Sequence, residues 1–252
     1  MSSLFMIDML LIMVIFLAAG MVKGVVGMGL PALSLALLCL MTDLTSAIAL
    51  MLVPAFVTNV YQAFSGGRIV ETFRKCPLFF VMAGLAIWPG AQALVRVDLP
   101  LLSGLLGICL ITYAAVSVAG TRLIGSWSRR WWTGPAFGAA NGVLTGLTGA
   151  FVFPGLIYLQ SIGLSRNELV QAMGILFTIS TVFLGLSMGQ LSLLTSDLSI
   201  QSGLAVIPAM AGMMVGSGIR NRISEILFRR LFFTVLALIG AVLVFNAVVN
   251  LP

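Results

Sequence analysis

The stretch KGVVGMGLP, residues 23 to 31, places one lysine, three glycines and a proline inside an apolar run that extends from Leu4 to Met41. As a single helix this run would be about 55 Å long, nearly twice the hydrocarbon thickness of a bilayer. Glycine and proline interrupt helices, and a lysine deep in an apolar segment is costly unless it faces a cavity or a counter-charge. The stretch therefore predicts a helix that breaks inside the protein beside a buried cation.

The composition places this break in a membrane. Of the 252 residues, 60% are hydrophobic and 8% are charged, and 13 basic and 7 acidic side chains cannot cover a soluble core of this size. The period-2 alternation of barrel strands is absent. No basic residue precedes the first apolar run, so we do not expect a cleaved signal peptide. The sequence predicts an all-α polytopic membrane protein.

Further apolar runs, each long enough to cross the bilayer, lie at residues 45–65, 77–95, 99–119, 134–162, 167–189, 199–218 and 231–250. The run at 134–162 begins GPAFGAANGVLTGLTGAFVFPGLIYL and is again interrupted by glycine and then by Pro154. We therefore predict two membrane repeats, 1–119 and 134–252, joined by a cytoplasmic linker at 120–133. Each repeat would contain a broken hairpin or discontinuous helix followed by three transmembrane helices.

An alignment of the two halves supports the repeat. GMVKG at residues 20–24 matches GAANG at 138–142, which makes Asn141 the counterpart of Lys23. ALMLVPAFVTN at 49–59 faces AMGILFTISTV at 172–182, which pairs Thr58 with Thr181. Corresponding breaks in two halves are typical of transporters whose substrate site lies between the repeats.

The basic residues indicate how the broken segments cross the membrane. If each segment crossed once, the loop arginines and lysines would divide six against six. If each returns to its starting side, the division is eleven against one, with Arg96 alone on the minority face, as the positive-inside rule expects. This arrangement inverts the second repeat relative to the first. It predicts that both termini lie outside the cytoplasm.

We expect the two breaks to form a binding site. Backbone that leaves a helix inside a bilayer needs partners, and free amides at a helix N-terminus attract anions. Lys23 adds a positive charge, although it could instead reach the interface or bind backbone carbonyls. The candidate contacts for a bound anion are Lys23, Gly24, Gly27, Gly29, Asn141, Thr145, Gly146, Thr148 and Gly149, with Thr58, Asn59, Gln62 and Thr181 on neighbouring helices. For the polar side chains, a hydrogen bond between helices is the alternative interpretation.

Several other functions are poorly supported. The chain has no histidine, and Cys39, Cys76 and Cys109 lie far apart, which argues against a metal site, a cofactor or an activated nucleophile. No phosphate-binding G-x-x-x-x-G-K-[ST] motif is present, so an ATP-driven pump is not expected. The positive charge is explained by membrane orientation and not by nucleic-acid binding.

In the order and duplication of these motifs, the chain resembles the sulfite exporter TauE/SafE family of membrane permeases. The resemblance rests on GMVKGVVGMGLP, on GAANGVLTGLTGAFVFP and on the closing GSGIRNRISEILFRRLFFTVLALIGAVLV, and it covers about residues 10 to 250. It implies a secondary transporter in the cytoplasmic (inner) membrane that exports small sulfur-containing anions such as sulfite, sulfoacetate or other sulfonates.

Two alternatives remain at this point: a passive anion channel, and a membrane subunit that passes sulfur species to a partner enzyme. Saturable exchange flux would exclude the first, and activity of the purified protein alone would exclude the second. No acidic residue lies deep in a span to carry a proton, so the membrane potential could drive an anion at about 2.3 kcal/mol per charge per 100 mV. The sequence leaves open the anion, the direction, the coupling ion and whether the chain forms a homodimer.

Overall fold

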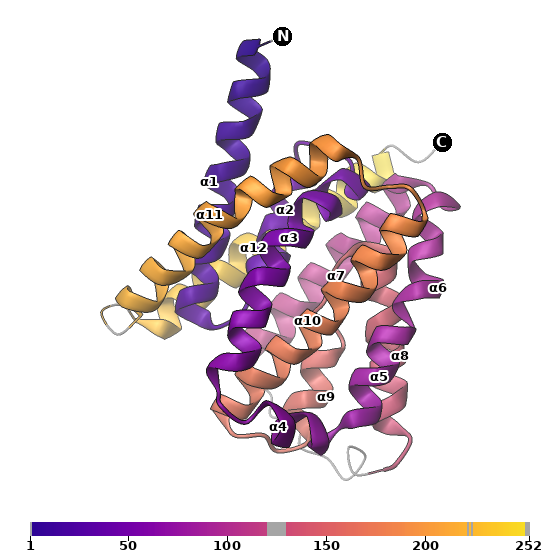
Figure 1. Cartoon of the computed structure of the whole chain (residues 1–252), viewed down its shortest axis with the longest axis vertical. Helices are drawn as coiled ribbons and strands as arrows, with labels where there is room; N and C mark the ends of the chain where they lie inside the picture. The colour runs from indigo at the N-terminus through magenta and orange to yellow at the C-terminus, as the bar shows by residue number, and fades with distance from the viewer. Residues whose placement is uncertain (1, 120–129, 221, 223, 250–252) are drawn as a thin grey trace.

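A computed structural model describes residues 2–119, 130–220, 222 and 224–249, and these residues form helices and connecting turns without a β-strand. Figure 1 shows the helices side by side in one bundle. The elements are α1 (Ser2–Val26), α2 (Leu30–Leu38), α3 (Leu44–Ser65), α4 (Ile69–Lys75), α5 (Pro77–Leu85), α6 (Ile87–Ala91), the 3-10 helix η1 (Gln92–Val95), α7 (Leu99–Ala119), α8 (Thr133–Thr148), α9 (Gly155–Ser161), α10 (Arg166–Gln190), α11 (Ser196–Ile219) and α12 (Glu225–Val249).

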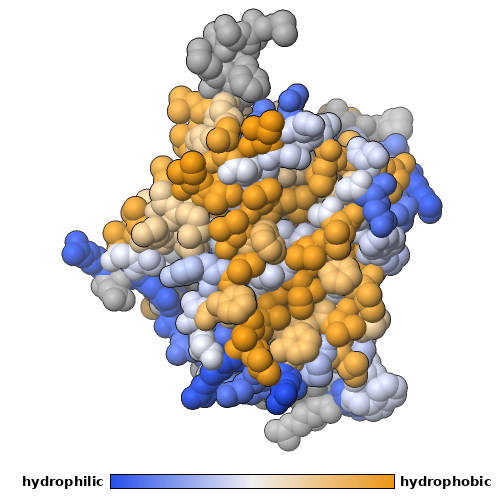
Figure 2. Space-filling view, viewed as in Figure 1, coloured by the Kyte–Doolittle hydropathy of each residue, from blue (hydrophilic) through white to orange (hydrophobic). Residues whose placement is uncertain are grey.

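Seven helical segments of the described residues are long and apolar enough to cross a membrane. Their outer faces carry large apolar side chains: Ile207, Leu238 and Phe245 are each more than 60% exposed. Figure 2 shows apolar side chains over much of the viewed surface and hydrophilic side chains gathered toward its margins. Such exposure suits lipid and not water, so the chain is a multi-pass membrane protein.

Both predicted helix breaks are confirmed. The first separates α1 from α2 at residues 27–29, where Gly29 adopts a left-handed φ of 113° and Pro31 follows in the first turn of α2. The second follows α8, which ends at Gly149 with a φ of 72°, and α9 begins after Pro154. Residues other than glycine rarely adopt these positive φ values, so the glycines allow the chain to leave each helix.

The span expected at 77–95 is less regular than the sequence analysis predicted. It consists of α5, α6 and η1, with an interruption at Ala86. Pro89 explains the interruption, because its ring lacks an N–H and clashes with the carbonyl of Leu85 four residues earlier. The short helix α4 was not predicted. Most of the expected linker at 120–133 lies outside the described residues.

Glycines bring several helices into backbone contact. α1 packs on α11, where Gly24 lies against the carbonyl of Met213 and Gly216 against the carbonyl of Met21. α8 packs on α5 and α6 in the same manner, with Gly142 against the carbonyl of Ala83. α3 packs on α10, and α7 packs on α12. Small residues at helix crossings are the usual basis of close packing in membranes.

The two ends of the bundle carry different helix termini. One end holds a cavity of about 260 Å³ lined by the start of α3, the start of α7 and the end of α12, with Asp43, Leu99 and Asn246 among its residues. The other end brings Arg68 after α3 together with the start of α10 and the end of α11. A broken segment that crossed only once would have placed Arg68 and Arg166 at opposite ends. The helix α1 begins and α12 ends at the same end of the molecule (Figure 1).

Candidate functional site

Lys23 lies in α1, one turn before the first break, and its side chain is inside the bundle. The residue is 3% exposed. Its Nζ donates to Thr58 Oγ1 at 3.2 Å and makes a short hydrogen bond to Asn59 Oδ1. Both partners lie on α3, so the lysine neither reaches an interface nor binds a backbone carbonyl.

The partners of Lys23 are themselves held in place. The Thr58 hydroxyl donates to the carbonyl of Pro54 at 2.8 Å, and Asn59 Nδ2 donates to Thr181 Oγ1 at 3.4 Å. The Thr181 hydroxyl in turn donates to the carbonyl of Phe177 at 2.6 Å. We call Lys23, Thr58, Asn59 and Thr181 the Lys23 cluster. It joins α1 and α3 of the first half to α10 of the second.

The cluster contains a lysine but no carboxylate. Among the described residues the ion pairs are Arg68–Glu71 and Lys75–Glu168, and both lie at the molecular surface. Burial of an ammonium beside neutral oxygens alone is unfavourable, because such partners do not replace its hydration or its counter-charge. The Lys23 cluster therefore has the composition of a site that is completed by an anion.

The polar residues of the second break are occupied within that break. Asn141 Oδ1 accepts from the amide of Gly155 at 2.9 Å and thereby ties α8 to the start of α9. The Thr145 hydroxyl donates to the carbonyl of Ala150 at 3.1 Å, and Thr148 Oγ1 accepts from the amide of Ala150 at 3.2 Å. No hydrogen bond among the described residues links Asn141, Thr145 or Thr148 to the Lys23 cluster.

The candidate glycines have structural surroundings of their own. Gly24 and Gly146 lie inside helices against α11 and α6 respectively. The amide of Gly27 donates to the carbonyl of Lys23 at 2.8 Å, and the amide of Gly149 donates to the carbonyl of Thr145 at 2.7 Å. Gly29 begins α2 beside the ring of Phe232. Because two of these amides are already bonded and the other three glycines pack against neighbouring elements, Lys23 and the α3 side chains are the stronger centre of a binding site.

Gln62 and Val170 connect the Lys23 cluster to one end of the bundle. Gln62 lies one turn beyond Thr58 on α3, is 5% exposed, and donates from Nε2 to the carbonyl of Val170 at 2.8 Å. Its Oε1 is buried without a partner among the described residues. A methyl group placed on Gly27 would lie 3.6 Å from a Val170 methyl, so α3, α10 and the first break meet here.

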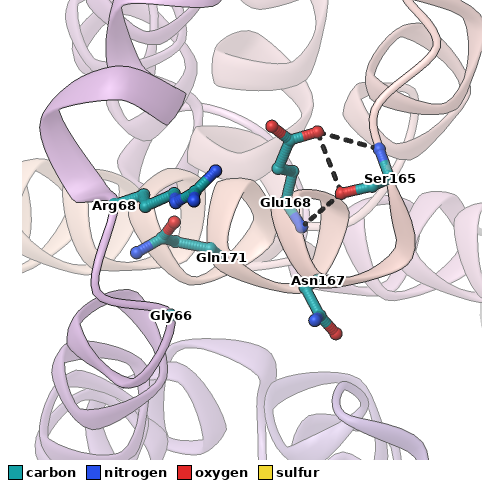
Figure 3. Close-up of a pocket in the computed structure, with 6 residues that line it drawn as sticks. All are labelled: Gly66, Arg68, Ser165, Asn167, Glu168 and Gln171. Atoms are coloured by element: carbon teal, nitrogen blue, oxygen red, sulfur yellow. Dashed lines mark hydrogen bonds between the residues drawn. The ribbon is translucent and has the colours of Figure 1, made fainter.

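Two adjoining cavities open on the far side of this contact. The first, of about 360 Å³, is lined by Gly66, Arg68, Ser165, Asn167, Glu168 and Gln171 (Figure 3). The second, of about 300 Å³, shares Gly66, Asn167 and Gln171 and adds Ser65, Arg166, Val170 and Arg220. We call the two together the basic vestibule, because three arginines from three different segments line it. Val170 belongs both to its wall and to the contact with Gly27.

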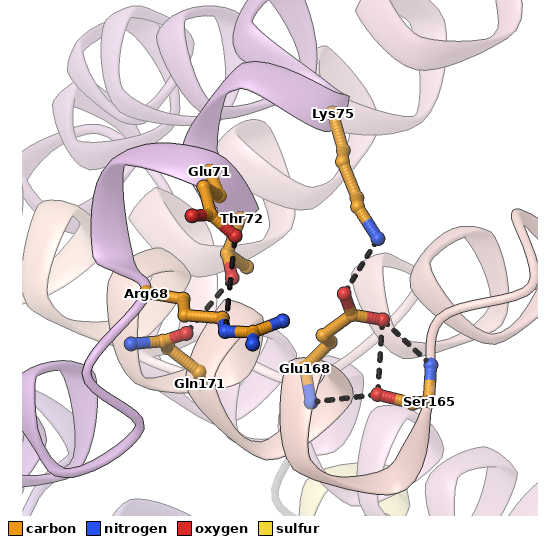
Figure 4. A network of polar contacts seen from close by, with 7 residues as sticks. All are labelled: Arg68, Glu71, Thr72, Lys75, Ser165, Glu168 and Gln171. Carbon is orange, nitrogen blue, oxygen red and sulfur yellow. Dashed lines mark hydrogen bonds and ion pairs between the residues drawn. The ribbon is translucent and has the colours of Figure 1, made fainter.

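A network of polar contacts holds the vestibule together (Figure 4). Gln171 accepts from the Thr72 hydroxyl at 2.8 Å and donates to the carbonyl of Ala63 at 2.9 Å. Lys75 Nζ lies 2.6 Å from a Glu168 carboxylate oxygen, and the other oxygen of Glu168 accepts from Ser165. The carboxylate of Glu168 is therefore engaged at the start of α10, and Arg68 Nε lies 3.9 Å from a carboxylate oxygen of Glu71.

Among the described residues no group of three or more Cys, Asp or Glu could hold a metal ion. Burial raises the pKa of the Cys76 thiol to about 12, so this cysteine is a poor nucleophile at neutral pH.

The structure thus brings together Lys23, Thr58, Asn59 and Thr181, which the sequence analysis named as candidates. It leaves Asn141, Thr145 and Thr148 at a separate break. Sequence reasoning missed Val170, Gln171 and the arginines of the vestibule. In the sequence the arginines were noticeable only as charged residues in loops, and nothing in the sequence distinguished Val170 from other apolar residues.

Comparison with known proteins gives one family. Residues 12–243 match the family model described as Sulfite exporter TauE/SafE, which covers most of the chain. The comparisons with curated proteins and with solved structures gave no match.

Proposed function

Because the chain belongs to the sulfite exporter TauE/SafE family of membrane transporters, we propose that it exports a small sulfur-containing anion by binding it at Lys23. Sulfite, sulfoacetate and other sulfonates are the proposed substrates, and the cytoplasmic (inner) membrane is the proposed location. The chain is a membrane transporter and not an enzyme.

One observation carries the assignment of the site: a buried lysine without a carboxylate contacts two neutral side chains next to a helix break. The anion would supply the missing counter-charge, and Nζ would hold it by a charge-assisted hydrogen bond. Thr58 and Asn59 would orient the lysine. Thr181 would extend the site to the second half, so that a bound anion could favour one arrangement of the halves over another.

We propose further that the halves are inverted repeats. This is supported by the direction of the matched helices: α3 ends where α10 begins, and α7 begins where α12 ends. The packing supports it too, because α1 meets α11 through Gly20 and Gly24 as α8 meets α5 through Gly138 and Gly142. Movement of one repeat against the other would expose the Lys23 cluster to alternate sides.

The basic vestibule is the proposed cytoplasmic entrance. Its arginines would raise the local concentration of anions at its mouth. The contact of Val170 with Gly27, together with the hydrogen bond from Gln62 to Val170, would separate the vestibule from Lys23 and would have to open for an anion to pass. The proposed cytoplasmic position of the vestibule places both chain termini outside the cytoplasm.

The test is anion-dependent thermal stabilisation of the purified protein. The panel is sulfite, sulfoacetate, taurine, thiosulfate, sulfate and lactate, each compared in wild type, in Lys23→Met and in Lys75→Met as a surface-lysine control. A ligand that binds only the folded protein raises the unfolding temperature in proportion to ln(1 + [L]/Kd). We expect a sulfite-dependent shift in wild type and in Lys75→Met, and an affinity lower by about ten- to hundred-fold in Lys23→Met, since a hydrogen bond to a charged group contributes about 1.5–3 kcal/mol.

A shift of equal size in Lys23→Met would place the anion elsewhere. Stabilisation by lactate but by none of the sulfur anions would contradict the proposed substrate class.

A further inference from the structure

The hydrogen-bond donors of Lys23 outnumber its acceptors by one if the side chain is an ammonium. Nζ has two partners in the structure, Thr58 Oγ1 and Asn59 Oδ1. An ammonium has three N–H donors and a neutral amine has two, together with a lone pair. The two oxygens therefore accept both N–H bonds of a neutral amine, whereas an ammonium would keep a third N–H that has no acceptor among the described residues.

The neighbouring hydrogen bonds fix these oxygens as acceptors. The Thr58 hydroxyl uses its proton on the carbonyl of Pro54, so its oxygen can only accept from Lys23. Asn59 uses Nδ2 on Thr181, which turns Oδ1 toward the lysine. Thr181 uses its proton on the carbonyl of Phe177, so it accepts from Asn59. No member of the Lys23 cluster can reverse its bond without breaking another.

The charged groups on the surrounding elements do not reach the lysine. α1 packs against α2, α11 and α12, and its lysine contacts α3. α2 has no titratable side chain, and α3 has only Tyr61, which is 59% exposed. α11 has Asp197 and Arg220 at its ends, and α12 has Glu225, Arg229 and Arg230 at its start. Within the described side chains none of these forms a bond with Lys23, so no fixed charge sets its protonation.

We propose that Lys23 binds a proton together with the anion and so couples transport to the proton gradient. The inference rests on the proposed anion site. In the empty site the side chain is an amine. When an anion enters, the amine lone pair takes one proton from water on that side, and the third N–H of the new ammonium donates to the anion.

On the other side the anion leaves, the N–H bond breaks, and the proton returns to water while the electron pair returns to nitrogen. One monoanion and one proton then cross together without net charge. For a dianion the net charge carried is one negative charge. A pH gradient therefore drives a monoanion through this site, whereas the membrane potential alone does not.

Proteoliposomes loaded with sulfite provide the test, because exchange and accumulation place different demands on the lysine. Exchange of internal sulfite for external ³⁵S-sulfite at equal pH needs binding but no net proton movement. Accumulation of ³⁵S-sulfite driven by a pH gradient, with the potential clamped by potassium and valinomycin, needs a proton to be taken up and released. We expect wild type to show both activities.

Lys23→Arg is the decisive variant, since its guanidinium stays protonated. We expect it to retain exchange within about tenfold of wild type and to lose accumulation driven by the pH gradient. Arg96→Lys, an exchange between the same two residue types at an exposed position outside the Lys23 cluster and the basic vestibule, should keep both. If Lys23→Arg is misfolded by size-exclusion chromatography, the wild type is tested instead for accumulation driven by the membrane potential alone, at equal pH on both sides and with a monoanionic substrate. Because one monoanion and one proton cross together without net charge, we expect no such accumulation.

Equal accumulation in wild type and in Lys23→Arg would overturn the proposed proton coupling, because the proton would then cross bound to the substrate as bisulfite. The proposed anion site would remain intact. Accumulation of a monoanion in wild type driven by the membrane potential alone would overturn the coupling in the same way. Absence of sulfite exchange in folded wild type would instead overturn the proposed function and with it this inference.

Discussion

At the scale of single residues, Lys23 and Asn141, which the sequence alignment of the two halves pairs, serve different contacts. Lys23 reaches across to α3, whereas Asn141 accepts from Gly155 and closes its own break. A charged side chain within the first break can bind a ligand. A neutral amide that already accepts from a buried N–H is better suited to holding the second break together.

Asn141→Leu tests this difference. The substitution leaves the buried amide of Gly155 without a partner, which costs about 1–3 kcal/mol, and we expect a lower unfolding temperature. Sulfite affinity should change far less than in Lys23→Met. Asn141→Asp is the control, because it retains the acceptor oxygen.

Normal stability combined with lost sulfite binding in Asn141→Leu would show instead that Asn141 contacts the anion. Thermal unfolding in detergent and sulfite titration of the same samples separate the two roles.

At the scale of the elements, proline and glycine interrupt or distort helices that their apolar composition alone would leave straight. Pro54 lies inside α3 and cannot donate to the carbonyl of Leu50. The Ser202 hydroxyl of α11 donates to that carbonyl at 2.8 Å instead, and it accepts from the amide of Val53 at 3.1 Å. The backbone groups that Pro54 affects in α3 are thus bonded by a side chain of α11. This contact lies on the same helix, α3, that carries Thr58 and Asn59.

Two glycines of α11 provide a matched test of helix packing. A Cβ on Gly212 would meet the carbonyl of Leu17 in α1, whereas a Cβ on Gly203 would meet nothing within 4 Å. We expect Gly212→Ala to destabilise the protein by about 1–3 kcal/mol through overpacking. Gly203→Ala should be neutral or slightly stabilising, because alanine favours the helix.

The measurement is the unfolding temperature of both variants in one detergent. Similar values for the two would mean that α1 and α11 adjust their spacing easily and that Gly212 does not determine it.

At the scale of the whole molecule, the position of the arginines follows from the number of crossings. Arg68, Arg166 and Arg220 line one vestibule, although the second break separates Arg68 from the other two arginines along the chain. Asp43, at the start of α3, lines a cavity at the other end. On the positive-inside rule, we propose that the vestibule faces the cytoplasm.

Single cysteines can test this orientation in a variant without the native cysteines. Arg68→Cys and Asn167→Cys, one from each half, should react with a membrane-impermeant maleimide only in inside-out vesicles. Asp98→Cys and Asp197→Cys should react only in intact spheroplasts. All four positions are exposed, so burial does not confuse the result. The reverse pattern would invert the proposed orientation, and labelling of Arg68→Cys and Asn167→Cys from different sides would contradict the topology.

The sequence by itself determined the membrane class, the position of most helices, both breaks and the buried cation. These features depend on local properties, namely the length of apolar runs, the freedom of glycine and the restrictions on proline, and each can be evaluated within a few tens of residues. Lys23 was conspicuous because a cation in an apolar run has few explanations. The interruption within 77–95 was missed because one internal proline can either kink a helix or end it.

Only the tertiary structure decided which polar residues meet. Thr58 lies 35 residues from Lys23, and Thr181 lies 122 residues from Asn59, so their contacts depend on how α1, α3 and α10 pack. The same packing directed Asn141 into its own break and placed Val170 between the vestibule and Gly27. A hydrogen bond requires its atoms to approach within about 3 Å, and sequence spacing alone does not determine distances between helices at that precision.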